Sequence, residues 1–353
     1  MKISFISNGS VIDCFPPFTG GIEALEFDLI KELKRRGNSV QLFASQSTLP
    51  NSVNIGFNWI WNERLHNFTS MMNCYFKKRK INGDLIHAHY PLTAIPFLGL
   101  KPLIYTEHNW YNLPGMDFHR TFFTRFFDST QKKVYEKADR IIALSSEIKK
   151  IIESKTNPEK VVLIPNFVNT KKFSPSKKIP NRIIFVGRLE KEKGIDLLLN
   201  ALKGEKDYEL CIIGEGSEKK NLQELASKNK VNATFKGLIP HSALNKEFAS
   251  ASIFVLPSFF EVMPVVVLEA LSSGCAVIAS DAFGIRDEIE NEKDGLVFKK
   301  GNLQQLKEKL NLLLKDENRV KLLGRNAREK ALKEFDVQII AEKTEKLYRE
   351  VLE

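Results

Sequence analysis

Apolar runs of β-rich composition alternate along the chain with longer segments in which apolar residues recur at helical spacing. This alternation predicts parallel sheets covered by helices on both faces, and it occurs once in each half of the chain. The expected strands span residues 2–7, 39–44, 85–89, 103–107, 140–144 and 161–164 in the first half, and 182–186, 209–213, 233–236, 253–256 and 276–279 in the second. Helical spacing is found at residues 22–36, 195–203, 217–227, 264–273 and 303–315.

A polar stretch with two prolines, Lys171–Pro180, lies between the halves and cannot continue a helix or a strand. We therefore expect two α/β domains, residues 1–175 and 182–334, joined by a linker at 176–181 and followed by a last segment at 335–353. The length of 353 residues suits two domains. Because open sheets of this kind bind ligands beyond the carboxyl ends of their strands, functional motifs are expected at strand ends.

The net charge of +10 is unevenly distributed. Residues 1–180 contain 25 Lys and Arg against 15 Asp and Glu, whereas residues 181–353 contain 28 of each kind. A nucleic-acid-binding protein would account for the basic half through phosphate contacts, but not for the neutral half. The four cysteines form no C-x-x-C pair, which favours a reducing, cytosolic compartment. We expect neither a signal peptide nor a transmembrane segment.

The densest candidate chemistry lies where a strand gives way to a helix opened by Pro264. Glu261 and Glu269 flank the start of this helix, whose free amides around Met263 and Val265 and positive dipole end favour an anion such as a diphosphate. Glu269 could accept hydrogen bonds from a ribose diol, and Glu261 from the hydroxyls of a sugar. Because the neighbours of Glu269 are apolar, we expect a partnered carboxylate rather than a solvated one.

The loop after the first strand of the second half carries two cations, Arg188 and Lys193, beside Gly187. Fixed cations suit a leaving diphosphate, although a charged surface turn is the alternative for this segment taken alone. No Asp-x-Asp motif occurs, so basic side chains are expected to neutralise the diphosphate in place of a metal ion.

Glycine pairs follow two other strands. Gly20 with Gly21, and Gly214 with Gly216, could bring backbone amides against a phosphate, or could form plain tight turns. No G-x-G-x-x-G motif is present, so a dinucleotide-dependent redox enzyme is not favoured.

Histidines follow two strands of the first half. His108 is placed to reach a sugar hydroxyl, although a lone histidine is usually structural. His87 and His89 share one face of a strand, but no third metal ligand is evident, so we interpret them as core or cleft residues.

Taken together, these motifs resemble the retaining, nucleotide-sugar-dependent glycosyltransferases of the GT-B fold, in the large family called group 1 or family 4. The pair Glu261 and Glu269, an E-x7-E motif, is the most specific mark. The other motifs, in chain order, are Gly20-Gly21, Ile164-Pro165-Asn166, Gly187-Arg188 with Lys193-Gly194, Gly214-Glu215-Gly216 and Asp294-Gly295-Leu296. The resemblance implies two Rossmann-like domains that face each other across a cleft, the first binding the acceptor and the second the nucleotide sugar.

The resemblance also implies a role for individual residues. Arg188 and Lys193 would hold the diphosphate, and Glu269 the ribose. Glu261 would hold the donor sugar with the amides of Met263–Val265. Gly21 would approach the phosphate, Leu238 or Ile239 would lie near the base, and residues 335–353 would form a helix that crosses back to the first domain. The chain departs from the family pattern at Val262, Asn109, Phe167 and Asn169.

The function expected from this resemblance is transfer of a hexose or N-acetylhexosamine from a UDP-sugar, in preference to a GDP-sugar, to a hydroxyl of a lipid-linked or membrane glycan. The leaving diphosphate would accept the proton of the attacking hydroxyl, and no metal or other cofactor is expected. A nucleotide-sugar epimerase or a phosphorylase on the same fold is the alternative. The sequence leaves the oligomeric state open.

Two basic and aromatic stretches, Phe76–Lys80 and Phe118–Phe127, would suit an anionic membrane surface. The alternative is that their phenylalanines are core residues of a helix whose lysines are solvated. The first hypothesis places the chain in the cytoplasm, bound peripherally to the inner face of the membrane.

Overall fold

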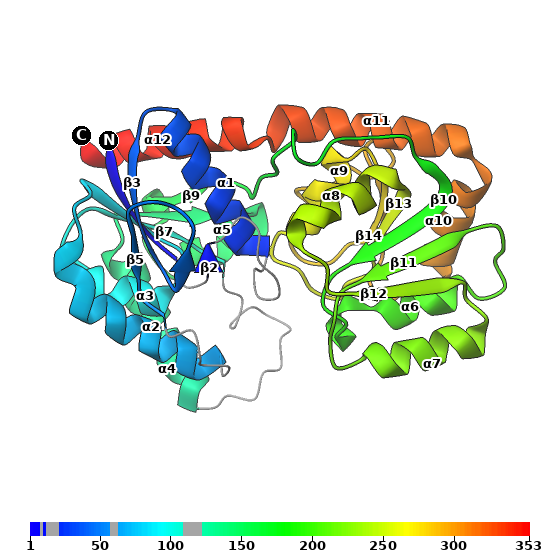
Figure 1. The fold of residues 1–353 in the computed structure, drawn as a ribbon, viewed down its shortest axis with the longest axis horizontal. Helices are drawn as coiled ribbons and strands as arrows, with labels where there is room; N and C mark the ends of the chain where they lie inside the picture. Colours follow the sequence, from blue (N-terminus) through cyan, green and yellow to red (C-terminus); the bar gives the residue numbers. More distant parts are fainter. Residues whose placement is uncertain (8–9, 12–20, 57–62, 109–121) are drawn as a thin grey trace. The chain divides into compact units, whose positions relative to one another are not determined.

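The computed structural model describes residues 1–7, 10–11, 21–56, 63–108 and 122–353. They form two compact units (Figure 1). Unit 1 comprises Met1–Pro165 together with Ile340–Glu353, and unit 2 comprises Asn166–Ile339. Each unit is built on one main parallel sheet, which confirms the α/β fold class predicted from the sequence.

The main sheet of unit 1 has seven strands in the order β5-β3-β1-β6-β7-β8-β9, all parallel. Its strands are β1 Lys2–Ile6, β3 Ser39–Ala44, β5 Ser52–Asn54, β6 Leu85–Ala88, β7 Leu103–Thr106, β8 Arg140–Ala143 and β9 Val161–Leu163. Two short strands, β2 Ser10–Val11 and β4 Gln46–Ser47, pair separately. Residues of β6 and β7 are buried throughout, as expected of strands covered on both faces.

The helices of unit 1 follow its strands. They are α1 Gly21–Arg35, α2 Glu63–Lys77, α3 Pro91–Ala94, α4 Phe122–Lys137, α5 Ser146–Glu153 and most of α12 Val337–Leu352, with short 3-10 turns η1 Lys78–Lys80, η2 Ile95–Phe97 and η3 Pro158–Lys160. Within the part of the chain that the structure describes, no helix combines the length and the apolar character needed to cross a bilayer.

The sheet of unit 2 has six parallel strands in the order β12-β11-β10-β13-β14-β15. They are β10 Ile179–Val186, β11 Glu209–Ile213, β12 Ala233–Gly237, β13 Ala251–Leu256, β14 Ala276–Ser280 and β15 Leu296–Phe298. The helical elements are η4 Lys191–Lys193, α6 Ile195–Ala201, α7 Lys219–Asn229, α8 His241–Ser250, α9 Val265–Ser272, α10 Leu303–Lys315 and α11 Glu317–Glu334. In Figure 1, α6 and α7 lie on the opposite face of this sheet from α8 and α9.

Both sheets have the strand order of a Rossmann-type fold, in which the chain winds outward from one strand in both directions. The order reverses between β1 and β6 in unit 1, and between β10 and β13 in unit 2. Loops that leave the two central strands at such a switch point diverge and can receive a ligand between them. The topology therefore assigns one candidate ligand-binding edge to each unit.

The structure corrects the domain boundary expected from the sequence. The units divide after Pro165, ahead of the expected linker at 176–181. The segment that follows Pro165 packs on unit 2, because the Asn166 side-chain amide donates to the Met263 carbonyl at 2.8 Å and the Phe173 ring packs against Phe248. Strand β10 then begins inside the expected linker. The prolines and polar residues indicated a segment without regular structure, but they did not indicate that this segment belongs to unit 2.

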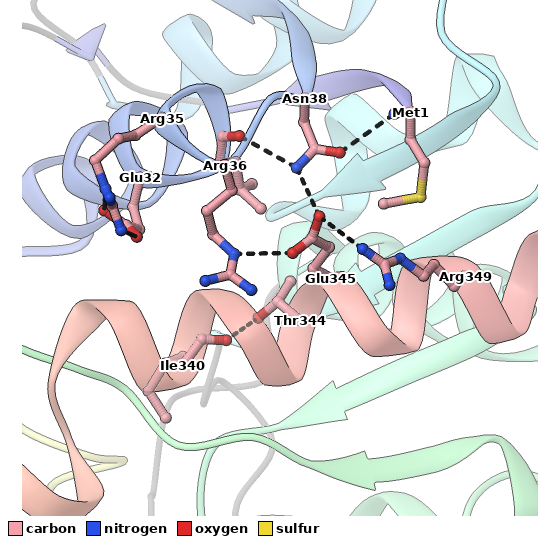
Figure 2. Close-up of polar contacts among 10 residues, drawn as sticks. Met1, Glu32, Arg35, Arg36, Asn38, Ile340, Thr344, Glu345 and Arg349 are labelled. Carbon is pink, nitrogen blue, oxygen red and sulfur yellow. Dashed lines mark hydrogen bonds and ion pairs between the residues drawn. The ribbon is translucent and has the colours of Figure 1, made fainter.

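The last helix, α12, is tied to unit 1 by a buried carboxylate (Figure 2). Glu345 accepts hydrogen bonds from Arg36 Nε at 2.8 Å, from Asn38 Nδ2 at 3.0 Å and from Arg349 at 3.2 Å. Burial alone would raise the pKa of Glu345, but the hydrogen bonds from Asn38 and Arg36 outweigh it and lower the pKa. One turn further along, the Tyr348 hydroxyl lies 2.6 Å from His87 Nδ1.

All the strands expected from the sequence are present, with small shifts at their ends. Helix α10 has the expected bounds, and α1, α6, α7 and α9 differ only at their ends. Five longer helices were not predicted as elements, namely α2, α4, α5, α8 and α11.

Candidate active site

The candidate site of unit 2 lies where the loops after β10 and β13 leave the sheet. The two loops touch, since the Phe259 amide donates to the Glu192 carbonyl at 2.8 Å. Gly194 makes this approach possible: its φ is +64°, and a Cβ there would lie 2.3 Å from the Pro257 carbonyl oxygen. Residues 187–194 and 257–264 therefore form one continuous surface at the switch point.

The loop after β11 packs against the loop after β10. Gly187 donates to the Ile213 carbonyl at 3.0 Å, and a Cβ on Gly214 would lie 1.9 Å from the Gly187 carbonyl oxygen. A Cβ on Gly216 would similarly lie 2.3 Å from the Leu189 carbonyl oxygen. Both glycines are thus required by close backbone packing, which gives Gly214 and Gly216 a supporting position behind Gly187 and Arg188.

An ion pair joins the two switch-point loops. Lys193 Nζ lies 2.6 Å from Glu261 Oε1, and the Ser258 hydroxyl donates to the same oxygen at 2.7 Å. Both charged side chains are largely buried. Ser258 is itself held by its carbonyl, which accepts from the Ser280 hydroxyl at 2.5 Å. The first glutamate of the E-x7-E motif is therefore fixed from two sides by groups that stabilise its charged form.

Arg188 has a different environment. Its guanidinium contacts Glu192 at 2.8 Å, four residues along the same loop, and its side chain is 60% exposed. An exposed ion pair of this type contributes little stability and exchanges easily for another anion. Arg188 is therefore free to turn to a ligand at the switch point, whereas Lys193 is already positioned.

The second glutamate of the motif lies inside the fold. Glu269 projects from α9, is 2% exposed and has its Oε1 2.6 Å from His241 Nε2 at the start of α8. His241 Nδ1 lies 3.3 Å from Lys172 Nζ, and its ring packs on Phe173. The expected partnered carboxylate is present, and its partner is a histidine that the sequence did not identify.

The turn that opens α9 is held by two contacts from elsewhere in unit 2. The backbone amide of Asn166 donates to Met263 Sδ at 3.1 Å and its side-chain amide to the Met263 carbonyl at 2.8 Å. On the other side, a Cβ at Gly284 would lie 2.0 Å from the Val262 carbonyl oxygen. Val262 follows the first glutamate of the motif, and Gly284 packs closely against its carbonyl. The amides of Val265 and Val266 precede the first backbone hydrogen bond of α9, which the Val267 amide donates to the Pro264 carbonyl at 3.0 Å.

The residues expected near the nucleotide base follow β12. Leu238 is exposed and Ile239 half-buried, in the short loop between β12 and α8. Gly237, with φ of +69°, ends the strand, and a Cβ there would lie 2.8 Å from Glu215 Oε1. The loop thus presents apolar side chains at the same strand-end edge as the loops after β10 and β11.

The corresponding edge of unit 1 carries a buried polar cluster. His89 Nδ1 lies 2.9 Å from His108 Nε2 and 3.6 Å from Glu26 Oε1, while Glu26 Oε2 accepts from the Ser7 hydroxyl at 2.5 Å. His89 Nε2 is buried without a hydrogen-bond partner, and its ring stacks on Phe5 at 4.3 Å. His108 is thus part of a hydrogen-bonded row rather than a lone residue.

Burial keeps this cluster uncharged. Desolvation lowers the pKa of His87 to about 3 and that of His108 to about 4, and it lowers the pKa of His89 well below its usual range. Desolvation and the nearby Glu23 raise the pKa of Glu26 well above its usual range. Among the described residues, no group of three or more His, Cys, Asp or Glu side chains is arranged to hold a metal ion.

The structure thus gathers most of the expected residues at one edge of unit 2. These are Gly187, Arg188, Lys193, Gly214, Gly216, Leu238, Ile239, Glu261, Met263, Pro264, Val265 and Glu269. His108 and the exposed Gly21, the first residue of α1, belong to unit 1, while Gly20 and Asn109 lie outside the described residues.

Three supporting residues were not recognised from the sequence as site residues. Ser258 lies in the loop that was singled out, and Asn166 in a quoted motif, so both had a signal. His241 had none beyond its place after a strand.

Two curated relatives illustrate the similarity. The chain is 35% identical over 154 residues to sulfoquinovosyl transferase SQD2 of Arabidopsis thaliana, a match that covers 43% of this chain and 30% of that protein. It is 28% identical over 302 residues, 81% of each chain, to a Campylobacter jejuni enzyme named GalNAc-alpha-(1->4)-GalNAc-alpha-(1->3)-diNAcBac-PP-undecaprenol alpha-1,4-N-acetyl-D-galactosaminyltransferase. The match to SQD2 spans less than two thirds of that relative, as do the matches to three other curated relatives, which span 62%, 65% and 27% of their lengths.

Solved structures share the fold. Sucrose-phosphate synthase from Thermosynechococcus elongatus superposes with a TM-score of 0.86 at 23% identity, over 99% of this chain and 98% of that one. HepE from Anabaena, solved with UDP and glucose, superposes with a TM-score of 0.78 at 19% identity, over 99% and 100%. These likenesses identify the fold as GT-B.

Two family models match consecutive parts of the chain. "Glycosyltransferase Family 4" matches residues 19–172, and "Glycosyl transferases group 1" matches residues 166–330. The two switch-point loops of unit 2, residues 187–194 and 257–264, lie within the second match. The chain belongs to the group 1 and family 4 glycosyltransferases of the GT-B fold.

Proposed function

We propose that this glycosyltransferase moves a hexose or N-acetylhexosamine from UDP to a hydroxyl of a lipid-linked or membrane glycan, with retention of the anomeric configuration and without a metal ion. Two similarities support the substrates. HepE was solved with UDP, and the Campylobacter jejuni relative is named for an undecaprenol-diphosphate-linked glycan. The chemistry rests on the side chains at the switch point of unit 2.

The Lys193–Glu261 pair is the observation that carries the proposal. It places an ammonium and a carboxylate side by side, near the start of α9, where the amides of Val265 and Val266 precede the first helical hydrogen bond. The ammonium, the amides and Arg188 suit the two phosphates of a nucleotide diphosphate, and the carboxylate suits the hydroxyls of the attached sugar. Leu238 and Ile239 supply apolar contact for the base, and Glu269 beside His241 is the acceptor proposed for the ribose hydroxyls.

Retention follows from the roles assigned to these groups. Glu261 is held by Lys193 and Ser258, so we assign it to sugar binding and not to proton abstraction. The leaving diphosphate oxygen, stabilised by Lys193 and Arg188, then accepts the proton of the acceptor hydroxyl on the face from which it departs. The new bond forms from the acceptor oxygen to the anomeric carbon as the bond to the diphosphate oxygen breaks. Cations that bind the leaving group most strongly when its charge develops lower the barrier.

The test is a matched pair of substitutions in η4. Lys193→Ala removes the positioned ammonium, whereas Lys191→Ala removes an exposed lysine of the same turn. We expect kcat/KM for transfer from a UDP-hexose to fall by roughly 10²–10³-fold in Lys193→Ala, as when one preorganised donor to a developing negative charge is removed. Lys191→Ala should stay near the original rate. Equal rates in the two variants would overturn the assignment.

The same assay separates the alternatives. Product anomers determined by NMR should match the donor, and activity should survive a metal chelator. A transferase needs an acceptor for sugar transfer, whereas conversion of the donor without an acceptor would indicate an epimerase, and cleavage that depends on inorganic phosphate would indicate a phosphorylase.

A further inference from the structure

Helix α2 has its large apolar side chains on the outside. Phe68, Met72, Tyr75 and Phe76 are 46%, 37%, 54% and 72% exposed. Their spacing of four, three and one places them on one face of the helix. Here they form a continuous exposed stripe rather than scattered apolar residues, which are common on protein surfaces.

Among the α2 residues whose side chains the structure describes, the two fully buried ones are small, and Met71 is half-buried. Ser70 and Cys74 are fully buried, and the Asn73 amide donates to the Ile55 carbonyl at 3.0 Å. A helix that packs on a core normally presents its large apolar residues inward and its polar residues to water. In the described part of α2 the exposed aromatic residues instead lie on the face opposite the buried Ser70 and Cys74, so packing against that buried face does not account for them.

Four cations stand at the carboxyl end of this stripe, Lys77 at the end of α2 and Lys78, Arg79 and Lys80 in η1. Lys78 Nζ lies 4.2 Å from the centre of the Tyr75 ring, and Lys77 Nζ donates to the Asn54 carbonyl. Within the described part of the chain, none of the four forms an ion pair with a carboxylate. The cations are thus attached to the apolar stripe and keep their charge available.

We propose that this surface, the α2 face made of Phe68, Met72, Tyr75, Phe76 and the cations at 77–80, docks on an anionic membrane surface. Aromatic and aliphatic side chains on one side of a helix enter the boundary between headgroups and acyl chains, and neighbouring lysines and arginines bind anionic headgroups. A second copy of the chain is a poorer occupant, because a two-fold contact through one patch brings the same cations together.

The α2 face explains part of the uneven charge of the chain. It deepens the proposed function, because a lipid-linked acceptor would be reached from the membrane surface on which unit 1 rests. In the second basic and aromatic stretch, residues 118–121 lie outside the residues that the structure describes, and Phe126 in α4 is exposed.

Vesicle flotation of the full chain tests the proposal directly. The vesicles are phosphatidylcholine alone, or phosphatidylcholine with one third phosphatidylglycerol, at low and at high salt. We expect binding to the anionic vesicles only, weakened by salt. The triple variant Lys78→Gln, Arg79→Gln and Lys80→Gln should lose roughly 100-fold in partition coefficient, since each cation near the surface contributes about a tenfold factor or less.

A second variant tests the aromatic half of the surface. Tyr75→Ser with Phe76→Ser should also reduce binding at least tenfold, and both positions are exposed enough for the fold to tolerate the change. The matched control is Leu322→Ser with Leu332→Ser, which removes two apolar side chains, 42% and 43% exposed, from α11 of unit 2 and should leave binding unchanged. Equal loss in the control, or equal binding to both kinds of vesicle, would overturn the proposal.

Two further readouts make the remaining outcomes informative. Light scattering of the same variants reports whether the α2 face joins two copies of the chain instead, which would overturn membrane docking if vesicles are not bound. Turnover of a UDP-hexose with a water-soluble acceptor should be unaffected by the α2 variants. Vesicle binding without any sugar transfer would refute the proposed function alone, and sugar transfer without vesicle binding would refute the α2 face alone.

Discussion

The two switch points share one topology, but one carries charged side chains and the other carries neutral ones. In unit 2 the edge carries charged groups in contact, with Lys193 and Glu261 2.6 Å apart. In unit 1 the edge carries histidines kept neutral by burial, with His89 and His108 2.9 Å apart, and a glutamic acid whose pKa is raised. All the excess positive charge belongs to the first 180 residues, yet none of the residues described above at the switch point of unit 1 is a lysine or an arginine. The net charge of a domain therefore says little about the charge at its functional edge.

The physical cause of the difference lies in the partners that each edge supplies. Lys193 finds Glu261 across the two loops, and Ser258 supports that carboxylate. His89 has Phe5 on one side and His87 and His108 on the others, so a proton on any of the three rings would be desolvated and repelled by the next. Unit 2 is arranged to hold a charged ligand, and unit 1 to present neutral hydrogen-bonding groups, which suits the hydroxyls of a sugar.

The largest expected difference between the two edges is in how acid affects the free energy of unfolding. The folded pKa of His87 is about 3, below the value near 6.5 of an unfolded chain, so the unfolded state binds more protons between these values. Stability should therefore fall as pH drops below about 6.5, by roughly 1.4 kcal/mol per pH unit for each such histidine. His87→Gln should reduce the loss between pH 6.5 and 5 by about 2 kcal/mol, measured by denaturant unfolding.

The matched control for that measurement is His241→Gln in unit 2. His241 lies against the carboxylate of Glu269 and outside the histidine row, so this variant shows whether replacing any histidine of the fold alters the acid limb. An acid limb that is the same in wild type and in His87→Gln would show that the histidine row of unit 1 is not what distinguishes the two edges.

Glu26 should act in the opposite direction and more weakly. Its folded pKa is raised by burial and by Glu23, so its contribution to stability is present below the unfolded pKa and is lost as pH rises. Glu26→Gln keeps an acceptor for the Ser7 hydroxyl and removes this loss. We expect the variant to gain stability over wild type at pH 8 and to gain nothing at pH 4, measured by denaturant unfolding.

Glu32 provides the comparison on the same helix. It is also buried in α1, but it is paired with Arg35 at 2.7 Å. Glu32→Gln therefore serves as the control for replacing a buried glutamate of this helix that lies outside the cluster at the strand ends. A gain of the same size in both variants would point to helix α1 as a whole and not to the cluster at the strand ends.

Features that depend on local sequence were predicted, whereas features that depend on long-range contacts were not. Short apolar strands such as β11 were located because burial on both faces leaves a continuous apolar run, and the E-x7-E pair because its spacing is local. The pairing of Glu269 with His241 joins residues 28 positions apart, and the unit boundary at Pro165 depends on long-range contacts of Asn166 and Phe173. Helix α2 was not predicted as an element.

The smallest effect is expected at the exposed ion pair of unit 2, which tests whether charge at this edge serves stability or binding. Arg188 and Glu192 are 60% and 36% exposed, so their attraction is screened by water and offset by side-chain ordering. Glu192→Gln should change the free energy of unfolding by less than about 0.5 kcal/mol. The same variant should bind UDP more tightly, measured by calorimetry, because Arg188 no longer has to leave a carboxylate to bind phosphate. A clear loss of stability with unchanged UDP affinity would mean that Arg188 braces its own loop, and that only Lys193 among the two cations faces the ligand.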